Sequence, residues 1–145
     1  MRTFRIGYTG DFLNAEGQPA HGPVGQDKFA RVPYIKHHFI KELAPNPNDT
    51  TYWDRLYSLE VEPEHIKNID GLIVLRPWVK PSVFRDGAEN LTMIGRFGVG
   101  YDKIDTDALT ANNVVLVPIR SGIGLRLGAN LGYLKFTPKA TWNPF

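Results

Sequence analysis

Arg76 follows directly on an apolar run, residues 71–75, and is the first candidate for chemistry in this sequence. A buried strand that ends in arginine places a guanidinium at its carboxyl end, where the planar group can hold a carboxylate through two parallel hydrogen bonds. The alternative is a surface arginine paired with a nearby acid such as Asp70, because such exposed pairs are common and stabilise a fold little. Both interpretations place Arg76 at the end of a strand.

Gly98, Val99 and Gly100 follow the next predicted strand and form the second candidate. Two glycines one residue apart allow a sharp turn whose backbone N–H groups converge on an anion. The alternative is a tight strand-to-helix turn that binds nothing. If the strands before Arg76 and Gly98 are neighbours, a guanidinium and a set of backbone donors face one point, and that arrangement suits a small carboxylate.

Other motifs predict little chemistry. Residues 122–128 (GIGLRLG) resemble a dinucleotide-binding loop, but the last glycine falls one place late and no acidic residue follows it. His37 and His38 are adjacent, so on a helix they would point about 100° apart and would not share a metal. The chain has no cysteine, which excludes disulfides, thiolate metal sites and thiol nucleophiles. We therefore predict no metal site.

Strands and helices alternate along the chain, and this order predicts the fold class. The pattern predicts a parallel α/β sheet with right-handed crossovers and helices on both faces. In such open sheets ligands bind beyond the carboxyl ends of the strands. The expected strands are 4–8, 52–59, 71–75, 91–97 and 114–117, and the expected helices are 27–43, 62–69, 79–89 and 105–112.

Composition is that of one globular domain. The chain has 145 residues, 42% of them hydrophobic and 22% charged, which is enough apolar material for a core. No apolar run approaches the length of a membrane span, and no secretory signal follows Met1. Together with the absence of cysteine, these features predict a cytoplasmic protein with no membrane partner.

Charge divides the chain near residue 117. Residues 1–117 hold 13 basic and all 15 acidic residues, whereas the last 28 residues hold four basic residues and no acid. Four dispersed charges are too few to predict a nucleic-acid partner. We therefore expect a domain over 1–117 and a basic tail of different character over 118–145.

Residues 70–117 resemble a known family. The segments DGLIVLRPWVKPSVF and LTMIGRFGVGYDKIDTDALTANNVVLV are similar to the amino-terminal half of the D-isomer-specific 2-hydroxyacid dehydrogenases, the phosphoglycerate dehydrogenase-like group. The resemblance implies a flavodoxin-like substrate domain within 1–117. It assigns substrate binding to Arg76, Gly98, Val99 and Gly100, and it makes Asp102 and Asp105 structural caps.

The same resemblance implies an incomplete enzyme. The family transfers hydride between NAD and a 2-hydroxy or 2-oxo acid, but its cofactor domain and its catalytic arginine, glutamate and histidine have no counterpart in this chain. The expectation is therefore a truncated oxidoreductase domain that binds a small 2-hydroxy or 2-oxo acid without NAD and without turnover. From composition alone, the acid-free segment 118–145 suggests the separate hypothesis of a frame-shifted tail. The alternative is a stand-alone carboxylate-binding or regulatory module. A homodimer, or association with a full-length homologue, is expected in either case.

Overall fold

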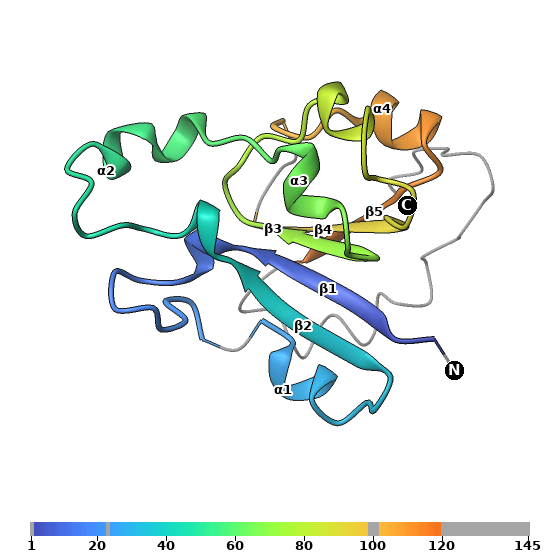
Figure 1. Ribbon diagram of the computed structural model, residues 1–145, viewed down its shortest axis with the longest axis horizontal. Coiled ribbons are helices and arrows are strands. Elements are labelled where there is room, and N and C mark those ends of the chain that lie inside the picture. The colour runs from blue at the N-terminus through green and yellow to red at the C-terminus, as the bar shows by residue number, and fades with distance from the viewer. Residues whose placement is uncertain (1, 23, 99–101, 120–145) are drawn as a thin grey trace.

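The computed structural model describes residues 2–22, 24–98 and 102–119 (Figure 1). Five parallel strands form one open sheet in the order β2-β1-β3-β4-β5. This is the doubly wound order of flavodoxin-like folds, so the predicted fold class is confirmed. The strands are β1 Phe4–Thr9, β2 Ile35–Ile40, β3 Gly71–Val74, β4 Met93–Phe97 and β5 Val115–Ile119.

The helices between these strands are short. The α-helices are α1 Gln26–Phe29, α2 Tyr52–Arg55, α3 Pro63–Ile66 and α4 Thr106–Ala111, and the 3-10 helices are η1 Gly10–Phe12, η2 Lys41–Leu43, η3 Leu56–Ser58 and η4 Pro81–Phe84. Figure 1 shows α1 on one face of the sheet and α3 and α4 on the other. α2 lies farther out, on the side toward which the strand arrows point.

Two apolar clusters, one on each face, hold the sheet in place. The larger cluster joins Leu72 and Val74 of β3 to Ile66 of α3 and Leu109 of α4. The smaller cluster packs Ile73 of β3 among aromatic residues that include Tyr8 and Phe12. Alternate residues of β3 therefore enter opposite clusters, as the pleat of a strand requires. All four β3 residues are buried, which identifies β3 as the central strand.

Three expected elements are wrong. The helix expected over 27–43 is α1 followed by the edge strand β2, since Ile35, His37 and Phe39 alternate with exposed side chains and pair with β1. The strand expected over 52–59 is α2 and η3, with Tyr52 and Leu56 on the inner face of the helical turn. The helix expected over 79–89 is limited to η4.

The domain boundary expected at residue 117 falls inside β5. Pro118 pairs with Arg96 and Ile119 pairs with Phe97. β5 is the last strand of the sheet, and an edge strand tolerates a proline that cannot donate a hydrogen bond. The sheet thus continues two residues beyond the expected boundary, and residues 120–145 lie outside the described part of the chain.

Candidate functional site

The carboxyl ends of β1, β3 and β4 bring charged side chains to one edge of the sheet. Asp11 follows β1, Arg76 follows β3, and Arg96 is the penultimate residue of β4. Gly10 makes the turn after β1 feasible, because a Cβ atom there would collide with the backbone of Ile40 and Ala44. Glycine at position 10 therefore allows the chain to pass close to Ile40 and Ala44 directly after β1, and this turn positions Asp11 at the carboxyl edge of the sheet.

Asp11 is the buried acid of this edge. Its side chain has no exposed surface, and its Oδ2 accepts a hydrogen bond from the backbone N–H of Arg76 at 3.1 Å. The Arg76 Nη1 lies 3.6 Å from the same oxygen. Burial raises the pKa of the Asp11 carboxyl, and the Thr9 hydroxyl and the Arg76 charge oppose that rise. The carboxylate is therefore held where ionisation is disfavoured.

Three cations, Arg76, Arg96 and Lys103, interact electrostatically with Asp11, and the exposed Asp102 is a second acid that acts on Arg96. The side chain of Arg76 is 30% exposed, so its guanidinium reaches solvent as well as Asp11. Burial lowers the pKa of Arg96, with the positive charge of Arg76 also lowering it. Burial likewise lowers the pKa of Lys103, and the charges of Arg96 and Arg76 add to that effect. The cations are thus close enough to repel one another, and the edge carries an excess of positive charge.

Gly98 makes room for one of these cations. Its φ is +126°, and a Cβ atom at this position would lie 3.0 Å from Nη1 of Arg96. That guanidinium donates to the carbonyl oxygen of Phe97. Glycine is therefore required at position 98 for two reasons: it adopts the positive φ readily, and its lack of a Cβ atom leaves space for the Arg96 guanidinium.

Two polar atoms at the edge are buried without a hydrogen-bond partner among the described residues. They are Oδ1 of Asp11 and the hydroxyl of Tyr52. Burial raises the pKa of Tyr52 to about 12, and the negative charge of Asp11 also raises it. The phenol therefore stays protonated and is available as a donor. We call Asp11, Tyr52, Arg76, Arg96 and Lys103 together the anion site.

The anion site fits a small oxyanion better than a metal. An oxyanion would accept hydrogen bonds from guanidinium, ammonium and phenol groups and would relieve the repulsion among the cations. In the described part of the chain, no group of three or more His, Cys, Asp or Glu side chains is placed to hold a metal ion.

The structure places the sequence-predicted residues as follows. β3 and β4 are paired neighbours, with Val74 opposite Arg96, so Arg76 and Gly98 stand at the same edge. The N–H of Gly98 donates to the carbonyl of Ile119 at 3.0 Å, so this amide already serves the sheet and is not oriented toward a ligand. Val99 and Gly100 lie outside the described residues.

Arg76 does pair with an acid, as the alternative interpretation expected, but the acid is not Asp70, which was the example given. Asp70 lies at the start of β3, where its Oδ1 is 2.6 Å from Arg2 Nη2 and its Oδ2 accepts from the Arg5 backbone at 2.7 Å. The acid beside Arg76 is Asp11. Sequence reasoning missed it, although Asp11 occupies the same position after its strand that Arg76 occupies after β3.

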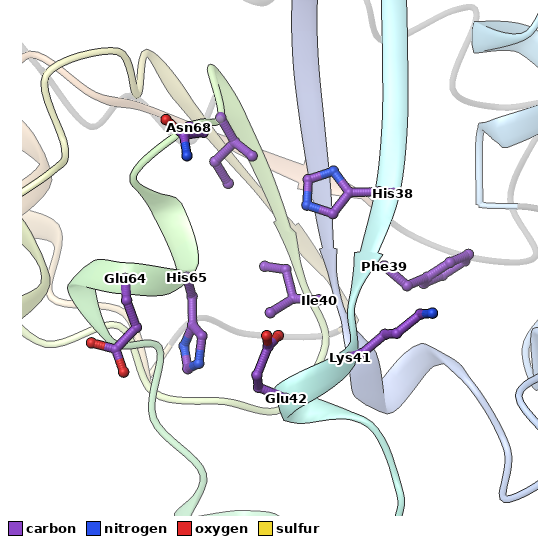
Figure 2. Close-up of a pocket in the computed structure, with 9 residues that line it drawn as sticks. His38, Phe39, Ile40, Lys41, Glu42, Glu64, His65 and Asn68 are labelled. Atoms are coloured by element: carbon purple, nitrogen blue, oxygen red, sulfur yellow. The ribbon is translucent and has the colours of Figure 1, made fainter.

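A concavity lies between the carboxyl end of β2 and the α3 segment. It has a volume of about 540 Å³ and is lined by His38, Phe39, Ile40, Lys41, Glu42, Glu64, His65, Asn68 and Ile69. Figure 2 shows Glu42 and His65 approaching each other below Ile40, while Lys41 points away. The Nδ1 of His65 accepts from the Glu62 N–H at 2.9 Å, an interaction that caps α3. This bond gives the histidine a structural role.

Comparison with known proteins gave one match. Residues 86–145 match the family described as EipA, Envelope integrity protein A. The matched segment includes β4, α4 and β5. No curated protein and no solved structure matched the chain.

This match corrects the function expected from the sequence. It covers most of the segment that carried the resemblance to 2-hydroxyacid dehydrogenases, and it continues through 118–145, which the resemblance left unassigned. The expectation of an NAD-dependent oxidoreductase domain is therefore wrong. The resemblance rested on short strand-and-turn motifs, such as a strand ending in arginine and a Gly-Val-Gly turn, and many open parallel sheets need such motifs for their backbone geometry.

Within the described residues, no helix is both long enough and apolar enough to cross a membrane. The expectations of a cytoplasmic location, of no NAD binding and of a 2-hydroxy or 2-oxo acid partner are not tested by these findings and stay predictions.

Proposed function

We propose that this protein binds a small oxyanion group at the carboxyl edge of its sheet and, through the ligand that carries this group, contributes to the integrity of the cell envelope. The observation that carries the proposal is the Arg76 guanidinium, which lies 3.6 Å from the buried Asp11 and close enough to Arg96 and Lys103 to lower the pKa of both. The likeness of residues 86–145 to the Envelope integrity protein A family supports the envelope role.

The charge balance of the edge argues for an anionic ligand. Two acids, Asp11 and Asp102, face three cations at this edge, and burial disfavours the ionised form of Asp11. An anion entering the site adds the missing negative charge at a position where the local dielectric constant is low, so each charge-assisted hydrogen bond is stronger than in water. The Tyr52 hydroxyl supplies a neutral donor at the same place.

Calorimetric titration of the full chain with inorganic phosphate, acetate, lactate and pyruvate tests the anion site. We expect saturable binding of at least one of these anions, and Arg76→Met should weaken that binding about tenfold or more, as expected for loss of a charged hydrogen bond. Methionine keeps the apolar stem of the side chain. Arg85→Met is the matched control, since Arg85 is exposed and lies at η4. Absence of binding by all four anions, or an equal loss in both variants, contradicts the proposal.

The envelope role needs a separate test in cells. We expect deletion of the gene to sensitise the source cells to detergent and osmotic shock, and we expect wild-type protein but not the Arg76→Met variant to restore resistance. Fractionation of the same cells locates the protein and tests the predicted cytoplasmic location. Normal resistance in the deletion strain would remove the envelope role while leaving the binding result intact.

A further inference from the structure

Exposed aromatic rings lie beside the anion site. Trp53 of α2 is 62% exposed, and Tyr57 of η3 is 68% exposed. Lys103 Nζ lies 5.0 Å from the ring centroid of Tyr57 and 5.6 Å from that of Trp78, and Lys80 Nζ lies 5.9 Å from the Trp78 ring. We call Trp53, Tyr57, Trp78, Lys80 and Lys103 the aromatic strip.

The packing of the α2–η3 segment leaves the rings of Trp53 and Tyr57 exposed to solvent. Tyr52 and Leu56 are buried and fix the inner face of the α2–η3 segment. Trp53 and Tyr57 are four residues apart, so they share a face of the helical turn, about 100° round from the face that Tyr52 and Leu56 bury. Figure 1 shows this segment standing away from the body of the sheet. Two large aromatic side chains on one solvent-exposed face indicate a contact surface, because apolar surface of this kind is usually covered.

The aromatic strip is continuous with the anion site through Lys103. The backbone carbonyl of Tyr57 accepts hydrogen bonds from Trp78 Nε1 at 2.9 Å and from Lys103 Nζ at 3.0 Å. Trp78 is two residues beyond Arg76 in the sequence. Lys103 therefore belongs to both groups and joins the anion site to the aromatic strip.

Electrostatics in the strip favours a polar ligand. Lys80 is paired with Glu60, and Arg55 of α2 is paired with Asp49. Lys103 makes no ion pair within the described part of the chain. The rings are thus flanked by neutralised charges, and Lys103 is the cation closest to them. A densely charged polymer or an anionic bilayer would require more free positive charge along the strip.

We propose that the ligand of the anion site is a cyclic sugar acid, whose acidic group is held by Arg76, Arg96 and Lys103 and whose ring packs on Tyr57 and Trp53. This inference rests on the proposed function. A pyranose ring has an apolar C–H face that packs on the electron-rich face of an aromatic ring, and it carries hydroxyl groups at its rim that accept hydrogen bonds from ammonium groups. The strip offers both kinds of contact.

Glucuronate and gluconate form a matched pair of probes, because they have the same number of carbon atoms and one carboxylate each, but only glucuronate forms a ring. We expect the full chain to bind glucuronate about fivefold or more tightly than gluconate, the gain expected from one aromatic contact. Tyr57→Ala should remove this difference in affinity between the two acids, while the Tyr57 carbonyl and its hydrogen bonds to Trp78 and Lys103 remain. Tyr34→Ala is the control, because Tyr34 is also exposed, at 45%, but precedes β2.

Each outcome of this experiment decides the inference. Equal affinity for the two acids overturns it while leaving the anion site in place, and so does an equal loss in the Tyr34→Ala variant. Benzoate bound as tightly as glucuronate shows that the strip selects aromatic acids and overturns the assignment to sugars. If no acid binds and phosphate does not bind, the proposed function fails together with this inference.

Discussion

Gly98 shows how strictly one residue is constrained by the anion site. An alanine there must adopt φ near +126° and place its Cβ 3.0 Å from Arg96 Nη1. We expect Gly98→Ala to lower the free energy of unfolding by about 1–3 kcal/mol, since backbone strain and displacement of the guanidinium act together. Urea denaturation measures this loss, and the anion titration measures the accompanying loss of affinity.

Gly17→Ala separates the two causes. Gly17 has a φ of +77° and no heavy atom within 4 Å of its ideal Cβ position, so alanine there meets backbone strain alone. We expect a smaller loss of stability, about 1 kcal/mol, with anion affinity unchanged. A Gly98→Ala variant no less stable and no weaker in binding than Gly17→Ala would show that Arg96 does not need the space at position 98.

Asp11 links stability to pH. Because burial raises the pKa of the Asp11 carboxyl above its ordinary value of 3.8, the native state holds this proton more tightly than the unfolded chain does. Unfolding therefore releases a proton between pH 3.8 and the raised pKa, and the contribution of Asp11 to the free energy of unfolding decreases as pH rises through that interval. Asp11→Asn should remove this decrease.

The test is urea denaturation of the wild type and of Asp11→Asn at pH values from about 3.5 to about 7. This range starts below the ordinary aspartate pKa of 3.8 and extends above it, so it includes the interval in which a raised pKa changes stability. We expect the stability of the wild type relative to the variant to fall with increasing pH. Carbon NMR of the Asp11 carboxyl gives its pKa directly. A midpoint at or below 3.8 would contradict the buried, disfavoured carboxylate described for the anion site.

At the level of elements, α4 depends on a single cap. The Asp105 side chain accepts a hydrogen bond from the Ala108 N–H at 2.9 Å. We expect Asp105→Ala to lower the free energy of unfolding by about 1 kcal/mol, because that N–H has no other partner within the first turn. Asp105→Asn should retain most of this stability, since asparagine also caps helices well.

Asp107→Ala provides the control for this cap. Asp107 is exposed and lies in the first turn of α4, so its loss removes only a favourable interaction with the helix dipole, about 0.3–1 kcal/mol. Thermal denaturation of the three variants measures both effects. A loss in Asp107→Ala equal to that in Asp105→Ala would show that charge near the helix terminus, rather than the hydrogen bond, stabilises α4.

The sequence predicted correctly those elements whose local residue pattern favours the same secondary structure that their packing in the fold requires. β3 is apolar on both faces, and Asp105 precedes a short helix that it caps. β2 was missed because the apolar residues of 27–43 also fit a helical spacing, and only pairing with β1 selects the strand. α2 was missed because aromatic residues favour strands in isolation, whereas burial of Tyr52 and Leu56 on one side selects a helical turn.

The same reasoning explains which site residues were predictable. Arg76 was identified because it terminates the most apolar strand of the chain. Asp11, Tyr52 and Lys103 come from segments with no such marker, and they meet Arg76 only after the sheet orders its strands as β2-β1-β3-β4-β5. Sequence reasoning therefore located the edge of the sheet but not the charge balance at that edge.

At the scale of the whole molecule, the described residues include a buried acid at each end of the sheet, Asp11 and Asp70, and the two differ in their partners. Asp70, at the amino-terminal end of β3, is 1% exposed and interacts with the Arg2 side chain and with both the backbone and the side chain of Arg5. Asp11, at the carboxyl end, has one carboxylate oxygen without a partner among the described residues. The hydrogen-bonding capacity of the acid at the amino end of the sheet is thus used by Arg2 and Arg5, whereas that of the acid at the carboxyl end is used only in part within the described residues.

Asparagine substitutions at Asp70 and Asp11 test this difference between the two ends of the sheet. Asp70→Asn replaces one charged acceptor of Arg2 and Arg5, so we expect it to lower the free energy of unfolding at pH 7 by about 1–3 kcal/mol. Asp11→Asn removes a charge whose ionisation burial already disfavours, so its effect should stay within about 1 kcal/mol and favour the folded state. Urea denaturation of both variants in phosphate-free buffer gives the comparison without a bound anion. If Asp11→Asn destabilised the fold as much as Asp70→Asn, then Asp11 would be a structural acid like Asp70, and the incomplete hydrogen bonding at the carboxyl edge would no longer mark a binding site.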